Sequence, residues 1–211
     1  MANFKLSKIG LYPIYHLNFS IQYELAMTFL RFQEHYESPN PKFRGHVFTF
    51  EEYVDWYIKT YRGFTYHEDW GGFNVPSYAI ETVKTSFPCL SKREKFLIEL
   101  VDNKIKDKQY YLIGTFGKTN LLTLKHEVCH GMFYCCPEYK KLTTEIVKKY
   151  KVKSLRNVLL NIGYCKEVLV DEIQAYAITG YLPMIRTKEM INLTKELKVN
   201  TLQFNIFKGI K

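Results

Sequence analysis

Apolar residues in the first part of the chain recur at helical spacing. Between residues 20 and 37 they stand three or four positions apart, as Ile21, Leu25 and Phe29 do, so one face of a helix would be apolar. The next four residues, Ser-Pro-Asn-Pro, end any helix because proline cannot continue one. The pattern therefore predicts an amphipathic helix over residues 20–37.

Two further helix starts carry a capping box, in which serine or threonine is followed three residues later by glutamate. The two pairs are Thr49 with Glu52 and Ser91 with Glu94. They predict helices over residues 50–61 and from residue 92 to about residue 103. Residues 63–76, which are rich in glycine and aromatic side chains, are predicted to form a loop between them.

The second half of the chain begins with a run of β-forming residues. Residues 110–116 are bounded by Lys-Asp-Lys and by glycine, which predicts a strand. Residues 120–136 are apolar on nearly every face and stop before a proline, which predicts a buried helix. Another helix is predicted over residues 165–179, capped by Gly180. The last thirty residues predict a further helix and a short extended tail.

Helices followed by a strand and by more helices indicate an α+β fold that is mainly helical with a small sheet. The length of 211 residues fits a single domain. Within residues 1–211 we expect a mainly helical part over residues 1–108, a strand with two helices over 109–183, and a C-terminal helix and tail over 184–211.

Composition excludes several classes of protein. With 46% hydrophobic and 24% charged residues, the chain has enough apolar side chains for a packed core, which excludes disorder over most of its length. No run approaches the roughly 20 apolar residues of a membrane span, and the start lacks the pattern of a secretory signal. The five cysteines form no regular framework, which favours reduced thiols and a cytoplasmic location.

The chain carries 30 Lys and Arg against 21 Asp and Glu, a net charge of +9. Such a surplus favours acidic partners, and nucleic acid is one candidate. The basic residues are spread along the chain, however, which favours surface solvation as their explanation. The densest group is Lys148, Lys149, Lys151, Lys153 and Arg156.

The predicted buried helix contains His126-Glu-Val-Cys-His130, an HExxH pattern. Residues four apart share a helix face, so both histidines can bind one cation, while Glu127 reaches a water beside it. From the residue frequencies, the number of such motifs expected by chance is on the order of 0.01. A metal would also explain polar side chains in an otherwise apolar helix. Cys129, inside the motif, is expected to pack in the core.

Catalytic zinc needs a third protein ligand. On the predicted helix over residues 165–179, Glu172 lies within the apolar stripe, where a carboxylate needs a cation. Glu167 lies on a more polar face, which favours a solvated role. We predict that His126, His130 and Glu172 are the metal ligands, with Glu167, His67 and Asp69 as alternatives to Glu172.

These residues resemble the gluzincins, HExxH metallopeptidases whose third zinc ligand is a glutamate. The segment Glu172-Ile-Gln-Ala-Tyr-Ala, followed by Tyr-Leu-Pro at residues 181–183, is most similar to the ImmA/IrrE-like branch. Tyr176 stands where that branch has asparagine or aspartate. Glu167 with Asp171 also resembles the E-x-x-x-D variant of thermolysin-like gluzincins, which leaves Glu167 open as a ligand.

The resemblance implies a zincin-like metallopeptidase core that holds zinc (Zn²⁺) and hydrolyses peptide bonds of a protein or peptide substrate. Glu127 would take a proton from the zinc-bound water and pass it to the leaving amine. Tyr176, Tyr134 and Tyr164 are candidate donors to the oxyanion. Residues 110–116 would be the edge strand along which zincins align an extended substrate.

The main alternative is a non-catalytic protein in which zinc only stabilises the fold and the function is binding, with nucleic acid as one partner of residues 148–156. An intermediate hypothesis is a DNA-associated protease similar to the SprT-like family. The intact Glu127 favours catalysis, because a structural zinc site does not need it. A separate structural zinc site at Cys135, Cys136 and Cys165 lacks a recognisable fourth ligand.

Overall fold

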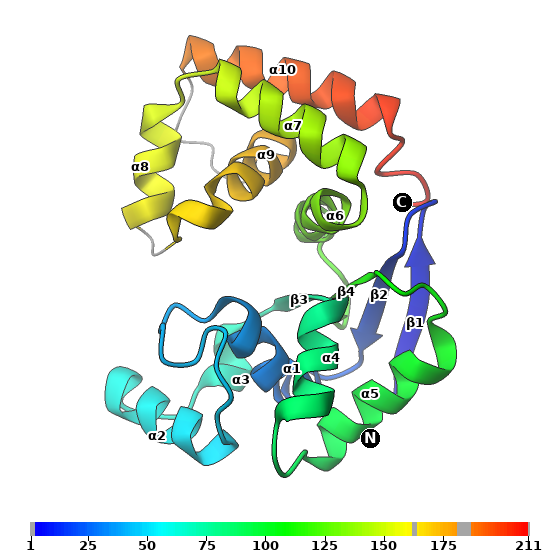
Figure 1. Cartoon of the computed structure of the whole chain (residues 1–211), viewed down its shortest axis with the longest axis vertical. Helices are drawn as coiled ribbons and strands as arrows, with labels where there is room; N and C mark the ends of the chain where they lie inside the picture. The colour runs from blue at the N-terminus through cyan, green and yellow to red at the C-terminus, as the bar shows by residue number, and fades with distance from the viewer. Residues whose placement is uncertain (1–2, 162–163, 181–186, 211) are drawn as a thin grey trace. The chain divides into compact units, whose positions relative to one another are not determined.

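The computed structural model describes residues 3–161, 164–180 and 187–210. The chain is mixed α and β, as predicted. It divides into two compact units (Figure 1): the first comprises Met1–Lys8 and Tyr15–Thr119, and the second comprises Ile9–Ile14 and Asn120–Lys211. The organisation of residues 1–211 as one domain stays a prediction.

A four-stranded sheet lies in the first unit, in the order β1-β2-β4-β3. The strands are β1 (Phe4–Ile9), β2 (Ile14–Phe19), β3 (Gly72–Pro76) and β4 (Tyr111–Phe116). β4 confirms the strand predicted over residues 110–116. Its expected role as an edge strand is wrong, because β4 lies between β2 and β3 and pairs with β3 in antiparallel register, Gly72 opposite Thr115.

The two strands that open the chain were not predicted, so the expected order of helices before the first strand is also wrong. In β2, Ile14 and Tyr15 are both buried although they are adjacent. From Tyr15 onward, however, the buried residues Tyr15, Leu17 and Phe19 alternate with the half-buried His16 and Asn18, which is the pattern of a half-buried strand.

The first predicted helix is α1 (Gln22–Glu37), and it packs against β3 and β4. Leu25 and Phe29 of its predicted apolar stripe are fully buried. A side chain at Gly114 of β4 would clash with both, since a Cβ atom there would lie 2.7 Å from Leu25 and 2.8 Å from the Phe29 ring. Glycine at this position thus lets the helix approach the strand closely.

Both capping boxes form as predicted. They begin α2 (Phe50–Tyr61), where Thr49 and Glu52 bond reciprocally, and α5 (Lys92–Lys104), where Ser91 and Glu94 do the same. The loop predicted over residues 63–76 is wrong in part, because it contains α3 (Tyr66–Asp69) and β3, and α4 (Ser77–Ser86) follows directly. The buried ring of Phe73 in β3 stacks on Phe29 of α1. This contact joins residues far apart in the chain, so the local sequence pattern does not predict it.

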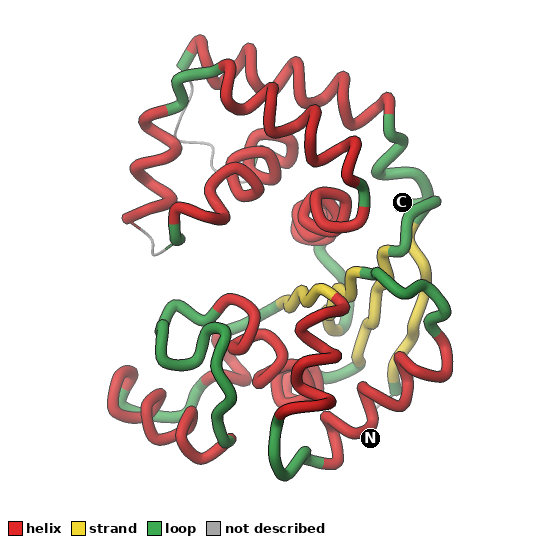
Figure 2. Tube along the Cα trace, viewed as in Figure 1, coloured by secondary structure: helices red, strands yellow, loops and turns green. Residues whose placement is uncertain are grey.

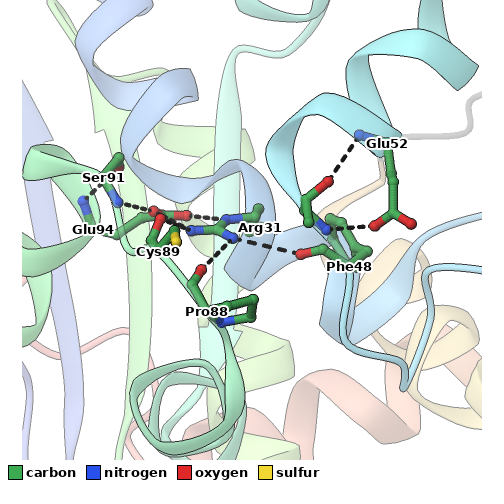
Figure 3. Close-up of polar contacts among 8 residues, drawn as sticks. Arg31, Phe48, Glu52, Pro88, Cys89, Ser91 and Glu94 are labelled. Carbon is green, nitrogen blue, oxygen red and sulfur yellow. Dashed lines mark hydrogen bonds and ion pairs between the residues drawn. The ribbon is translucent and has the colours of Figure 1, made fainter.

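A buried ion pair connects α1 to α5 (Figure 3). Arg31 Nε and Nη2 donate to the two carboxylate oxygens of Glu94, each over 2.6 Å. Its other donors reach the backbone carbonyls of Phe48, Pro88 and Cys89 over 3.3–3.5 Å. All five N–H bonds of the guanidinium therefore have acceptors. We call this group the Arg31 cluster.

The second unit is built of helices (Figure 2). They are α6 (Leu121–Cys135), α7 (Pro137–Lys149), α8 (Lys153–Asn161), a 3₁₀ turn η1 (Lys166–Val168), α9 (Leu169–Thr179) and α10 (Lys188–Gln203). α6 packs against α7 and α9, and α10 packs against α7 and α9. Among the described residues, no helix combines the length and the apolar character that crossing a lipid bilayer requires.

The helix predicted over residues 120–136 is confirmed as α6, whereas the helix predicted over residues 165–179 starts later, because residues 166–168 form η1 and α9 begins at Leu169. α6 is capped by Asn120, and α9 ends at Gly180, whose φ of 71° is the left-handed conformation expected of a C-cap. The predicted extended tail is wrong, because residues 204–209 form turns after α10. The Tyr-Leu-Pro segment at residues 181–183 lies outside the described residues.

Candidate metal centre

Packing of α6 against α9 brings together the three predicted metal ligands. His126 and His130 lie on α6, Glu172 lies on α9, and one donor atom from each falls within 4.8 Å of the others. All three side chains are buried, with exposed fractions of 9%, 6% and 6%. The structure thus assembles two imidazoles and one carboxylate inside the second unit.

The three donors approach without bonding to one another. Nε2 of His126 lies 3.8 Å from Oε2 of Glu172, and Nε2 of His130 lies 3.7 Å from Oε1. Both distances exceed that of a hydrogen bond. Among the residues described, Glu172 Oε2 has no hydrogen-bond partner although it is buried. An unpartnered buried carboxylate oxygen is costly, and a cation between the donors would satisfy it.

Each histidine is oriented through its other ring nitrogen. Nδ1 of His130 lies 2.9 Å from Oδ1 of Asp171, and an ionised carboxylate can only accept a hydrogen bond. Nδ1 of His126 lies 3.5 Å from the hydroxyl of Thr179, which donates its own proton to the carbonyl of Ala175 over 2.8 Å and so accepts from the ring. In the neutral rings both Nδ1 atoms therefore carry the proton, and both Nε2 atoms offer a lone pair on the side of Glu172.

The local electrostatics of the metal-free protein favour a cation. Burial, and then the nearby His130, lower the pKa of His126 to about 3. Burial raises the pKa of Glu172 to about 7; His130 opposes that rise, while Asp171 adds to it. Burial lowers the pKa of His130, but the carboxylates of Asp171 and Glu172 outweigh it and raise that pKa overall. Without a metal, the charged form of His130 is favoured and partly compensates an ionised Glu172, and a bound cation would take the place of that proton.

Glu127 lies beside the three-ligand group without belonging to it. It is half-buried, one residue after His126 and about 100° further around α6. Its charge contributes to the raised pKa of Glu172 and of His130, so it is electrostatically coupled to both.

The other predicted ligands lie elsewhere. Glu167 is exposed in η1, outside the three-ligand group. In the first unit, the carboxylate of Asp69 accepts hydrogen bonds from Tyr57 and Thr65, and Nε2 of His67 lies 3.4 Å from Glu68. Of the acids considered, the structure brings Glu172 to the two histidines, and its role as a ligand stays a prediction.

Of the three candidate oxyanion donors, Tyr176 and Tyr164 both lie next to predicted ligands. The Tyr176 ring lies 4.6 Å from the His126 ring, centroid to centroid. The Tyr164 hydroxyl lies 3.3 Å from that of Tyr176, and Tyr164 also hydrogen-bonds Glu172. Tyr134 is half-buried one helical turn beyond His130.

The contact from Asp171 to His130 was missed in the sequence. The thermolysin-like pattern pairs Asp171 with Glu167 and does not predict a hydrogen bond to His130. Its position in the sequence was a usable signal: Asp171 is adjacent to the predicted ligand Glu172, and histidine ligands of metals commonly donate their second N–H to a carboxylate. Which histidine it reaches depends on how α9 lies against α6.

The cysteines behave mainly as packing residues. Cys129 is fully buried in α6, as predicted, and all five cysteines are free thiols. Sγ of Cys135 lies 3.7 Å from the carbonyl of Pro13, and Sγ of Cys136 lies 3.6 Å from Glu138. Over the described part of the chain, Cys135, Cys136 and Cys165 do not form a group that could hold a metal.

Comparison of the chain with models of protein families, with curated proteins and with solved structures gave no match. The gluzincin hypothesis therefore depends on the HExxH motif and on the geometry of the three-ligand group.

Proposed function

We propose that the chain is a zinc-dependent metallopeptidase of gluzincin type that hydrolyses peptide bonds of a protein or peptide substrate. One observation carries the proposal: two Nε2 atoms and a buried carboxylate with an unpartnered oxygen lie within 4.8 Å of one another, beside Glu127. A buried carboxylate oxygen without a donor is costly, and a cation would satisfy it. Glu127 adds a general base that a purely structural site does not need.

The donor set fits zinc. Two imidazole nitrogens and one carboxylate oxygen are the protein ligands of many catalytic zinc sites, which keep a fourth position open. Bound zinc would supply Lewis acidity, which polarises a carbonyl oxygen and makes a water molecule more acidic. His126, His130 and Glu172 would hold the ion, and Asp171 and Thr179 would keep the rings oriented.

The remaining steps are assigned to side chains of this protein. Glu127 takes a proton from the attacking water and then donates it to the nitrogen of the leaving amine, so that the carboxylate is regenerated. The hydroxyl of Tyr176, next to His126, donates a hydrogen bond to the carbonyl oxygen as negative charge develops on it.

The proposal includes a zincin-like core and a cytoplasmic location. The five free thiols support a reducing compartment. The alternative of a nucleic-acid-binding protein loses some support, because Lys149 of the lysine group already forms an ion pair of 2.9 Å with Glu196. The observed position of Glu127, outside the ligand group, favours the enzyme.

Metal content is the first test. Elemental analysis of the purified chain should find about one zinc per chain, and His126→Ala should lose it. No metal in the wild-type protein after zinc is supplied would overturn the proposal.

Hydrolysis is the second test, with fluorescently labelled casein as the probe. Glu127→Gln should bind zinc like the wild type but lower the rate by about 10²- to 10⁴-fold. Glu145→Gln, on the exposed surface of α7, makes the same change of charge and should leave the rate unchanged. Bound zinc with no difference between Glu127→Gln and Glu145→Gln would instead favour the zinc-stabilised binding protein.

A further inference from the structure

A chain of buried hydrogen bonds ends at the partner of His130. The Asn200 amide of α10 donates to Thr143 of α7 over 2.9 Å, and Thr143 lies one turn after Tyr139 on the same helix. The Tyr139 hydroxyl donates to Oε1 of Gln174 on α9 over 2.9 Å, and Nε2 of Gln174 donates to Oδ1 of Asp171 over 2.9 Å. Together these side chains connect three helices to Asp171.

The chain has a direction. Tyr139 has one hydroxyl proton and gives it to Gln174. Because Gln174 accepts through Oε1, its NH₂ group faces Asp171. Oδ1 of Asp171 then receives two donors, Gln174 and Nδ1 of His130. Every link therefore points its donor toward the aspartate.

Packing alone does not account for these residues. Tyr139, Thr143 and Gln174 are fully buried. Leucine or phenylalanine would fill similar volume without the cost of placing polar groups in a low-dielectric interior. Tyr139, Gln174 and Asp171 are hydrogen-bonded in series, which fixes one arrangement of their side chains, whereas Oδ1 of Asn200 has no partner among the described residues.

We propose that Gln174 and Tyr139 are positioning residues for the metal centre. They hold the carboxylate of Asp171 in place. The Nδ1–H group of His130 then stays hydrogen-bonded to Asp171, and Nε2 of the same ring faces Glu172. Without Gln174, Asp171 loses its second donor and rotates more freely, and the imidazole loses its fixed orientation. The inference rests on the proposed metal site.

Cobalt(II) is the probe, because its absorption spectrum reports the geometry of its ligands. Gln174→Met keeps the side-chain length but removes both hydrogen bonds. It should weaken cobalt binding by about 10-fold and change the spectrum of the bound ion. Tyr139→Phe keeps the ring and removes one link further away, so its effect should be in the same direction and smaller.

Tyr150→Phe is the matched control. Its hydroxyl donates to Glu196 over 2.6 Å, outside the chain that leads to Asp171. We expect wild-type cobalt affinity and spectrum for this variant, whatever it does to thermal unfolding of the metal-free protein. In the double variant of Gln174 and Tyr139, the two losses should not add, because both act through Asp171.

The outcomes separate this inference from the proposed function. Wild-type cobalt affinity and spectrum in both Gln174→Met and Tyr139→Phe would overturn the positioning role while leaving the metal site intact. Equal losses in Tyr139→Phe and Tyr150→Phe would overturn it as well, since the effect would then be one of general stability. If Gln174→Met does not fold, Tyr139→Phe alone decides. A wild-type chain that binds no cobalt would overturn both proposals.

Discussion

Two buried charged clusters, one in each unit, are built in opposite ways. In the Arg31 cluster, five N–H donors meet the carboxylate of Glu94 and three backbone carbonyls (Figure 3). In the second unit, His126 and His130 present their Nε2 atoms to another acceptor, the carboxylate of Glu172. The first cluster has matched donors and acceptors, whereas the second leaves Oε2 of Glu172 without a donor among the described residues.

Burial does not distinguish the two clusters, because the side chains of both are buried. The balance of donors and acceptors does. A matched cluster is complete by itself and stabilises one arrangement of helices, so any loss of a partner is costly. An unmatched cluster is completed by a ligand of opposite charge, so its cost falls when the ligand binds.

The largest effect is expected from breaking the matched cluster. Arg31→Met leaves Glu94 buried without its partner and should lower the free energy of unfolding by about 3–5 kcal/mol. Urea unfolding of the full chain, followed by circular dichroism, measures this loss. A loss below about 1 kcal/mol would contradict the view that the Arg31 cluster is closed.

Removing both partners is the control for that experiment. The double variant Arg31→Met with Glu94→Leu places apolar side chains at both positions, so no charge is left unpaired. We expect it to recover most of the stability lost by Arg31→Met. A double variant as unstable as the single one would assign the loss to packing.

Zinc binding to the unmatched cluster should raise the free energy of unfolding by about as much as Arg31→Met lowers it. Zinc at about 1,000 times its dissociation constant should raise the free energy of unfolding by about 4 kcal/mol, because it binds the folded chain. Thermal unfolding with and without a chelator measures the difference. The same zinc should leave His126→Ala unchanged, and equal stabilisation of that variant would place the bound zinc elsewhere.

The smallest effect is expected when the unmatched cluster loses its carboxylate in the metal-free protein. Burial raises the pKa of Glu172 to about 7, so at pH 8 this side chain is ionised at a cost that glutamine avoids. Glu172→Gln should therefore change the free energy of unfolding by about 1 kcal/mol or less, in the stabilising direction. A marked destabilisation would mean that Glu172 already has a compensating partner.

Glu167→Gln is the matched control for Glu172→Gln. Because Glu167 is exposed, its replacement should change stability by about 0.5 kcal/mol or less and leave zinc affinity unchanged. Glu172→Gln should weaken zinc binding instead. Zinc affinity is measured by competition with a fluorescent chelator. A larger loss of affinity in Glu167→Gln than in Glu172→Gln would make Glu167 the ligand.

Elements that depend on neighbouring residues were predictable from the sequence. The capping boxes at Thr49 and Ser91 position the starts of α2 and α5 through contacts three residues apart. The strands β1, β2 and β3 were not predicted although their apolar residues alternate with polar ones, because each is only five or six residues long and β2 and β3 lie beside β4, which is far along the chain. β4 was recognised from its composition, but its interior position in the sheet depends on those same partners.

The candidate metal centre divides in the same way. The spacing of His126 and His130 by itself places two imidazoles on one face of α6, because one helical turn is 3.6 residues. Only the tertiary structure decided that Glu172, and not Glu167, meets them, and that Asp171, Gln174 and Tyr139 continue inward from His130. The spacing within a helix is a property of the local backbone, whereas the meeting of α6 with α9 and α7 results from packing between helices distant in the chain.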